Sequence, residues 1–180
     1  AGSLLPPQKE EASPPAPAVV EKAIDALNSI VSREYTTILQ YLYQAWVADN
    51  CRITRELFED RAQEEMKHMG WFSESVEELG GSPNLEFEEF DRARDIPTML
   101  SVDRQREVET NELYRSQSEQ LSELTEVKEL LDRITAQEEY HVTDFERLLR
   151  EAGGEPAEGP AEAAPPAELP TPARVKPQST

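Results

Sequence analysis

Both histidines of this 180-residue chain stand three positions after a glutamate, giving the pairs Glu65 with His68 and Glu138 with His141. On an α-helix, side chains three positions apart lie on one face and can reach the same ion. A lone histidine on a helix is more often a core or surface residue than a metal ligand, but the repeated spacing favours the ligand interpretation. Carboxylates and imidazoles without thiolates suit iron or manganese.

Three expected helices each carry a glutamate in the middle of an otherwise apolar stripe, namely Glu34, Glu65 and Glu138. Such stripes are recognised by apolar residues at intervals of three and four. Burial of one unpaired carboxylate is strongly unfavourable, and a single case is usually relieved by an arginine or by the rim of the core. Three cases in one small domain favour a shared compensating charge, which a buried cation would supply.

A fourth carboxylate would complete such a site, and the candidates are Glu107, Glu109 and Glu112. The interval from Glu34 to Glu65 is 31 residues, and the residue 31 positions before the second Glu-x-x-His pair is Glu107. A bundle of two related hairpins would place equivalent ligands in this way, so we expect Glu107 at the site and the other two in solvent. The predicted metal-binding and catalytic residues are Glu34, Glu65, His68, Glu107, Glu138 and His141.

Proline positions delimit the segments that can be helical, because proline inside a helix removes a hydrogen bond and clashes with the preceding turn. Of the 14 prolines, five lie in residues 1–17 and seven in residues 156–177. Four helices are predicted between these groups, over residues 19–48, 53–79, 98–121 and 126–151. We expect one all-α domain over residues 19–152, with a flexible tail over 1–18 and a disordered, proline-rich tail over 153–180.

The lengths of the connections predict how the helices are joined. Short links follow the first and third helices, whereas the segment SPNLEFEEFDRARDIP makes a long link after the second. Two antiparallel hairpins joined by a long crossover form one of the known arrangements of four-helix bundles. A metal site in the core of such a bundle would take its ligands from all four helices.

The composition argues against several classes of partner. The chain has 18 basic and 37 acidic side chains, and a net charge of −19 argues against a nucleic-acid partner. Its single cysteine, Cys51, permits neither an intrachain disulfide nor a cysteine-based metal site. No apolar run approaches the ~18 residues needed to span a membrane, and no secretory signal is visible. We therefore expect a cytoplasmic protein without a membrane partner.

Taken together, these residues resemble the bacterioferritin family of the ferritin-like di-iron carboxylate superfamily. The likeness covers residues 20–150, in the segments REYTTILQYLYQAW, EMKH, GGSPNL, MLSVDRQRE and EEYH. It implies a ferritin-like four-helix bundle that binds two iron ions per subunit. It further implies that Glu65 and Glu138 bridge the two irons. The remaining ligands would be Glu34 and His68 on one iron, and Glu107 and His141 on the other.

The resemblance also implies a function, a ferroxidase that oxidises Fe(II) to Fe(III) with O2 or H2O2 for iron storage and detoxification. Family members form homo-oligomeric cages. Met66 stands where they bind haem b at a dimer interface, so it is a candidate haem ligand, and plain packing of a flexible side chain is the alternative. Tyr41 lies on the same stripe as Glu34, where it could hydrogen-bond the centre, supply an electron or simply pack.

The chain departs from the family after residue 152, where GGEPAEGPAEAAPPAELP replaces a short fifth helix that helps to close the cage. An open dimer, an altered cage, or packaging by the tails inside another protein shell are the alternatives. Two other functions stay open: a di-iron oxidase or peroxide-scavenging protein of the rubrerythrin kind, and a non-catalytic, metal-stabilised bundle whose tails dock onto a partner. Storage predicts many irons per chain, whereas the other functions predict about two.

Overall fold

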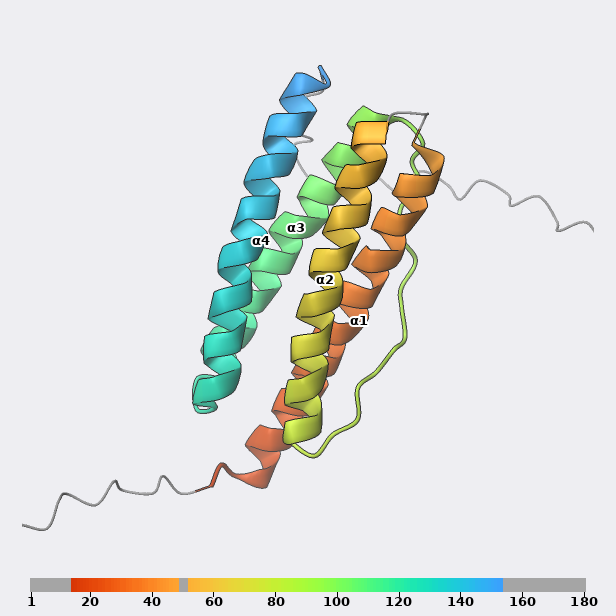
Figure 1. The fold of residues 1–180 in the computed structure, drawn as a ribbon. Coiled ribbons are helices and arrows are strands. Elements are labelled where there is room, and N and C mark those ends of the chain that lie inside the picture. Colours follow the sequence, from red (N-terminus) through yellow and green to blue (C-terminus); the bar gives the residue numbers. More distant parts are fainter. Residues whose placement is uncertain (1–13, 49–51, 154–180) are drawn as a thin grey trace, which may run out of the picture.

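A computed structural model of the chain describes residues 14–48 and 52–153, and these residues form a bundle of four α-helices (Figure 1). The helices are α1 (Pro17–Val47), α2 (Arg52–Glu78), α3 (Ile96–Gln120) and α4 (Thr125–Glu151). Each predicted helix is present, with its ends within two residues of the predicted ones, so the all-α fold is confirmed. The tails predicted over 1–18 and 153–180 lie mostly outside the described residues, although α1 already begins at Pro17.

Proline and glycine set the helix ends in the expected way. Pro17 and Pro97 both lie in the first turn of a helix, where a missing N–H costs nothing. Asp95 caps α3 by accepting a hydrogen bond from the backbone N–H of Thr98 at 3.0 Å. Just beyond α2, Gly80 adopts a φ of 84°, a left-handed conformation that favours glycine.

The helices form two antiparallel pairs, α1 with α2 and α3 with α4. The crossover between α2 and α3 runs along the outside of the bundle beside α1 (Figure 1). Four polar side chains of α1, spaced four residues apart, form hydrogen bonds with the backbone of the crossover. They are Asn28, Ser32, Thr36 and Gln40. The long crossover predicted from sequence is therefore present and lies against α1.

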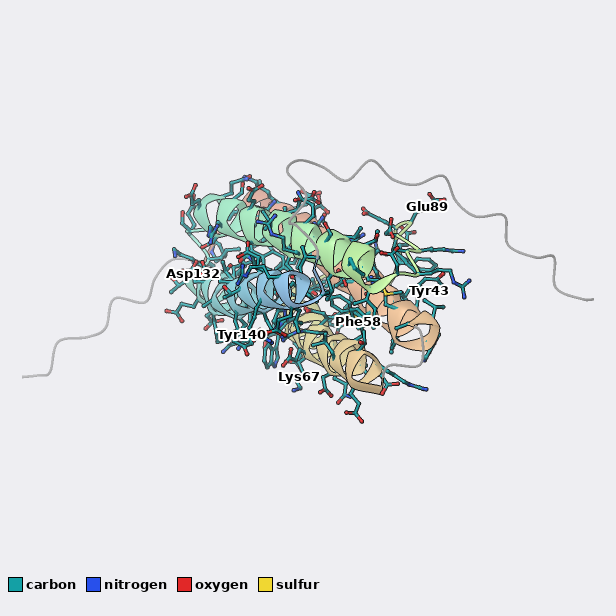
Figure 2. All side chains as sticks on the ribbon, turned by 90° about the horizontal axis from the view of Figure 1, so that it is seen from above. Tyr43, Phe58, Lys67, Glu89, Asp132 and Tyr140 are labelled. Carbon is teal, nitrogen blue, oxygen red and sulfur yellow. The ribbon has the colours of Figure 1, made fainter. Side chains whose placement is uncertain are left out.

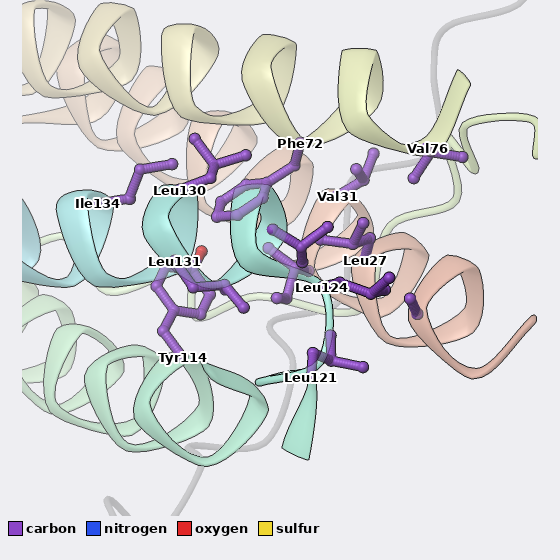
Figure 3. Close-up of a cluster of buried hydrophobic side chains, with 13 residues drawn as sticks. Leu27, Val31, Phe72, Val76, Tyr114, Leu121, Leu124, Leu130, Leu131 and Ile134 are labelled. Atoms are coloured by element: carbon purple, nitrogen blue, oxygen red, sulfur yellow. The ribbon is translucent and has the colours of Figure 1, made fainter. Parts of the chain in front are cut away.

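The apolar core has two clusters, and polar residues separate them along every helix. One cluster includes Leu27, Phe72, Tyr114 and Leu131 (Figure 3). The other includes Ile38, Phe58, Met99 and Phe145. On each helix, the glutamate or Glu-x-x-His pair of the predicted site lies between these two groups. None of the helices in the described part of the chain combines the length and apolar character needed to cross a membrane.

Candidate metal centre

All six side chains predicted to bind metal lie together in the middle of the bundle. Their exposed fractions are Glu34 2%, Glu65 1%, His68 2%, Glu107 2%, Glu138 0% and His141 3%. The alternatives on α3, Glu109 and Glu112, are exposed. The 31-residue interval therefore selected the one of the three glutamates that points inward.

The six residues fall into two overlapping groups that could each hold a metal ion. One group is Glu34, Glu65, His68 and Glu138, and the other is Glu65, Glu107, Glu138 and His141. Within each group, one ligand atom per residue lies within 4.8 Å of the others. Because Glu65 and Glu138 belong to both groups, their two-oxygen carboxylates can serve two ions at once.

Both histidine rings turn their Nδ1 atoms toward the shared carboxylates. Nδ1 of His68 lies 3.0 Å from Glu65 Oε2 and 2.7 Å from Glu138 Oε1. Nδ1 of His141 lies 2.9 Å from Glu138 Oε2 and 3.2 Å from Glu65 Oε1. The two rings face each other with centroids 6.2 Å apart. Four side chains from α2 and α4 thus direct nitrogen and oxygen atoms toward one another in the middle of the bundle.

Several of these atoms lie close to one another, yet they form no well-aligned hydrogen bond among the described residues. They are Oε1 of Glu65, both carboxylate oxygens of Glu138 and Nδ1 of His141. Buried polar atoms are nearly always satisfied in folded proteins, and leaving a carboxylate oxygen unsatisfied is costly. Two divalent cations would satisfy these atoms. The four carboxylates of the centre would nearly neutralise the charge of the two cations. The residues present therefore fit a dinuclear centre of iron or manganese.

Without metal, protons compensate the clustered charge. Burial, together with the charges of Glu65 and Glu138, raises the pKa of both Glu34 and Glu107. Burial alone would raise the pKa of Glu138, but the close imidazole rings lower it below its ordinary value. Burial alone would lower the pKa of His68, but the carboxylates of Glu138 and Glu65 raise it to about 11.

Two buried tyrosines hydrogen-bond Glu34 and Glu107, the two glutamates that each belong to only one ligand group. Each tyrosine comes from the neighbouring helix. Tyr114 on α3 donates a hydrogen bond to Glu34 on α1, and Tyr41 on α1 donates one to Glu107 on α3. Of the roles left open for Tyr41, the hydrogen bond to the centre is confirmed, and the supply of an electron stays a prediction. Tyr114 was missed from sequence, although it follows Tyr41 by the same 73 residues that separate Glu34 from Glu107.

A surface pocket leads to the centre between α2 and α4. Its volume is about 420 Å³. The lining residues are Glu64, Lys67, His68, Trp71, Ala136, Gln137, Tyr140 and His141. Figure 2 shows Lys67 and Tyr140 on neighbouring outer surfaces of α2 and α4. The two imidazole rings thus separate the pocket from the buried carboxylates.

Met66, the candidate haem ligand, lies outside this cluster. Its side chain is 51% exposed on the outer surface of α2, although its neighbour Glu65 points into the bundle. An exposed methionine at this place is compatible with an interfacial ligand and equally with a free surface residue. Its role therefore stays a prediction.

Comparison with known proteins agrees with this geometry. The family described as the ferritin-like domain matches residues 24–167 of the chain. The chain belongs to this family. The predicted membership of the ferritin-like superfamily is thereby confirmed, as is the ferritin-like bundle. No curated protein matches the chain.

Many solved structures share the fold, among them the following three. A ferritin-like, diiron-carboxylate protein from Bacillus anthracis str. Ames is 29% identical, with a TM-score of 0.70, covering 74% of this chain and 99% of that one. Bacterioferritin from Rhodobacter capsulatus is 22% identical, with a TM-score of 0.69, over 74% of this chain and 86% of its own. Bacterioferritin from Desulfovibrio desulfuricans is 23% identical, with a TM-score of 0.71, over 86% and 97%.

Proposed function

We propose that the protein is a ferroxidase that oxidises Fe(II) to Fe(III) with O2 or H2O2 at the buried centre. The six proposed ligands, which are also the proposed catalytic residues, are Glu34, Glu65, His68, Glu107, Glu138 and His141. The observation that carries the proposal is the pair of overlapping ligand groups that share Glu65 and Glu138. A shared pair of carboxylates is what two ions in one site require, whereas a structural site for one ion needs a single group.

Two ferrous ions held there would together supply two electrons, which reduce O2 with two protons to H2O2, or H2O2 with two protons to water. The chain's own residues hold the site for this chemistry. Glu65 and Glu138, which belong to both ligand groups, would hold both ions. Tyr41 and Tyr114 hold the terminal carboxylates by hydrogen bonds. The apolar clusters on either side exclude water along the bundle axis.

Iron is proposed as the metal because of the proteins that share the fold. The structure from Bacillus anthracis is described as diiron-carboxylate, and that of Desulfovibrio desulfuricans bacterioferritin as having a diiron site in different catalytic states. We carry over to this chain two irons per subunit, storage and detoxification of iron, a homo-oligomeric assembly and a cytoplasmic location as parts of the proposal. Haem at Met66 is a further part of it, whereas packaging within another protein shell is an alternative to a cage formed by the protein itself.

A second candidate is a di-iron oxidase or peroxide-scavenging protein that stores no mineral of its own. The observation that favours it is the likeness to the Bacillus anthracis protein, whose description names a diiron-carboxylate protein and no storage, and which is 29% identical against 22% and 23% for the two bacterioferritins. The two candidates use the same centre. They differ in the amount of iron that each chain retains.

Stopped-flow oxidation of Fe(II) by the metal-free protein tests the proposal. We expect fast formation of Fe(III) for about two irons per chain, lost in Glu65→Ala and retained in Glu139→Ala. Glu139 is a matched control because it lies beside Glu138 but forms a surface ion pair with Arg115 at 2.6 Å. Oxidation no faster than in buffer would overturn the ferroxidase. Iron retention that stops near two per chain would select the second candidate over storage.

A further inference from the structure

The outward nitrogens of the two histidines contact different chemical groups. Nε2 of His68 lies 2.8 Å from the amide oxygen Oε1 of Gln137. Nε2 of His141 lies 3.1 Å from the carboxylate oxygen Oε2 of Glu64. Each contact crosses between α2 and α4, so each helix supports the histidine of the other.

These two outer residues occupy equivalent positions in the two halves of the bundle. Glu64 directly precedes Glu65, and Gln137 directly precedes Glu138, so the two are separated by the same 73 residues as the ligands. The ligand atoms of the halves are therefore alike, glutamate for glutamate and histidine for histidine. The first difference between the two halves is the group that contacts the outward nitrogen of the histidine. It is the carboxylate of Glu64 at His141 and the amide of Gln137 at His68.

Both outer contacts select the same form of the imidazole. An oxygen at Nε2 accepts the N–H there, which leaves the lone pair of Nδ1 free to bind a metal ion. A carboxylate is a stronger acceptor than an amide oxygen, so it makes the imidazole a better electron donor. Support of this kind typically changes metal affinity by about 10–100-fold.

An arginine holds the carboxylate of Glu64, the residue that contacts His141, and no arginine among the described residues holds Gln137 in the equivalent way. Arg61 donates to Glu64 at 2.6 Å and to Asp144 at 2.6 Å, and its side chain is 8% exposed. The equivalent position in the other half is Ile134, an apolar core residue that cannot hold Gln137 in the same way. The chain Arg61–Glu64–His141 therefore has no counterpart at His68.

We propose that Glu64 and Gln137 are positioning residues that make the two halves of the centre unequal. The half with Glu107 and His141 binds its ion more tightly than the half with Glu34 and His68. This inference rests on the proposed metal centre and adds an order of filling to it. A divalent ion added in limiting amount occupies the His141 half first.

Anaerobic titration of the metal-free protein with Co(II), followed by visible absorption and by calorimetry, tests this order. The parent protein should bind two Co(II) per chain in two steps of different affinity. Glu64→Gln supplies an amide to both halves, so the tighter step should weaken about tenfold and the two steps should approach each other. Gln137→Glu supplies a carboxylate to both, so the weaker step should tighten instead.

Glu139→Gln is the matched control, because it removes one surface carboxylate beside Glu138 without contact to either ring and should leave both steps unchanged. Two steps that are indistinguishable in the parent, or that stay unchanged in both Glu64→Gln and Gln137→Glu, would overturn the inference and leave the metal centre intact. Absence of Co(II) binding at the centre would overturn the inference together with the proposed function.

Discussion

Tyr114 donates a hydrogen bond to Glu34 across 80 residues of sequence, and both side chains are fully or almost fully buried. The bond joins α3 to α1. The bond from Tyr41 to Glu107 is its counterpart, with the tyrosine on α1 and the glutamate on α3. Glu34 and Glu107 of the candidate centre are therefore each held by a tyrosine from the neighbouring helix.

We expect Tyr114→Phe and Tyr41→Phe each to lower the free energy of unfolding of the metal-free protein by about 1–3 kcal/mol, because each change leaves a buried carboxyl oxygen without its donor. Urea denaturation measures this. Tyr140→Phe is the control, since Tyr140 is 63% exposed and its change should stay within about 0.5 kcal/mol. Equal stability of all three variants would contradict the structural role of the two buried hydroxyls.

Metal binding should stabilise the fold, because Oε1 of Glu65 and both carboxylate oxygens of Glu138 form no well-aligned hydrogen bond without it. Addition of Mn(II) or Co(II) at about 100 times its dissociation constant should raise the free energy of unfolding by about 2.7 kcal/mol for each independent site. Thermal melting with and without metal shows the effect. Glu138→Ala should lose this increase and Glu139→Ala should keep it. A melting temperature of the parent protein that does not change on addition of either metal would argue against a buried site.

Binding of metal should release protons. His68, whose pKa is raised to about 11, carries a proton at pH 7 in the metal-free centre, and the raised pKa values of Glu34 and Glu107 favour their protonated forms. A metal ion must displace these protons to reach the ligand atoms. We expect acidification of a weakly buffered solution on titration with Co(II), and weaker binding as the pH falls. Metal affinity that is the same at pH 6 and pH 8 would contradict this electrostatic account.

Asp103 should make stability depend on pH. It is fully buried on α3 and accepts hydrogen bonds from the amides of Gln40 at 2.6 Å and Gln44 at 2.9 Å. Burial raises its pKa to about 7 although the two amides lower it. An unfolded aspartate has a pKa of about 3.9, so between these values the folded state binds the extra proton. The contribution of Asp103 to stability therefore falls as the pH rises from about 4 to about 7.

Asp103→Asn removes this titration. Relative to the parent, the metal-free variant should gain about 1–3 kcal/mol in free energy of unfolding between pH 5 and pH 7. Urea denaturation at both pH values gives the comparison. Asp25→Asn, at an exposed position of α1, should keep a constant difference from the parent. A constant difference for Asp103→Asn as well would mean that this carboxyl does not titrate as the structure indicates.

The helices and the ligand cluster could be predicted because both leave periodic signals in the sequence. Apolar residues at intervals of three and four define the buried face of each helix, and a glutamate on that face, such as Glu34, contradicts the pattern visibly. Glycine and proline mark where helices end and begin. Helix α3 is polar and has no clear apolar stripe, so this signal did not identify Glu107. Only the internal repeat of the sequence did.

The supporting residues could not be predicted because they depend on how the helices are rotated and paired. Glu64 and Gln137 look like ordinary surface residues, and only the antiparallel packing of α2 and α4 brings them to the opposite histidines. Asp103 sits on a helix rich in charged residues, so its burial against Gln40 leaves no apolar signal. Tyr114 could have been found by applying the 73-residue repeat to Tyr41.

Anomalous diffraction from crystals soaked in Fe(II) without oxygen tests the dinuclear centre most directly. Two iron peaks per chain are predicted inside the cluster, about 3.5–4 Å apart. Glu65 and Glu138 should lie between the peaks, with His68 Nδ1 on one ion and His141 Nδ1 on the other. A single iron in the bundle, or iron bound only at surface carboxylates, would contradict a dinuclear centre and with it the proposed ferroxidase.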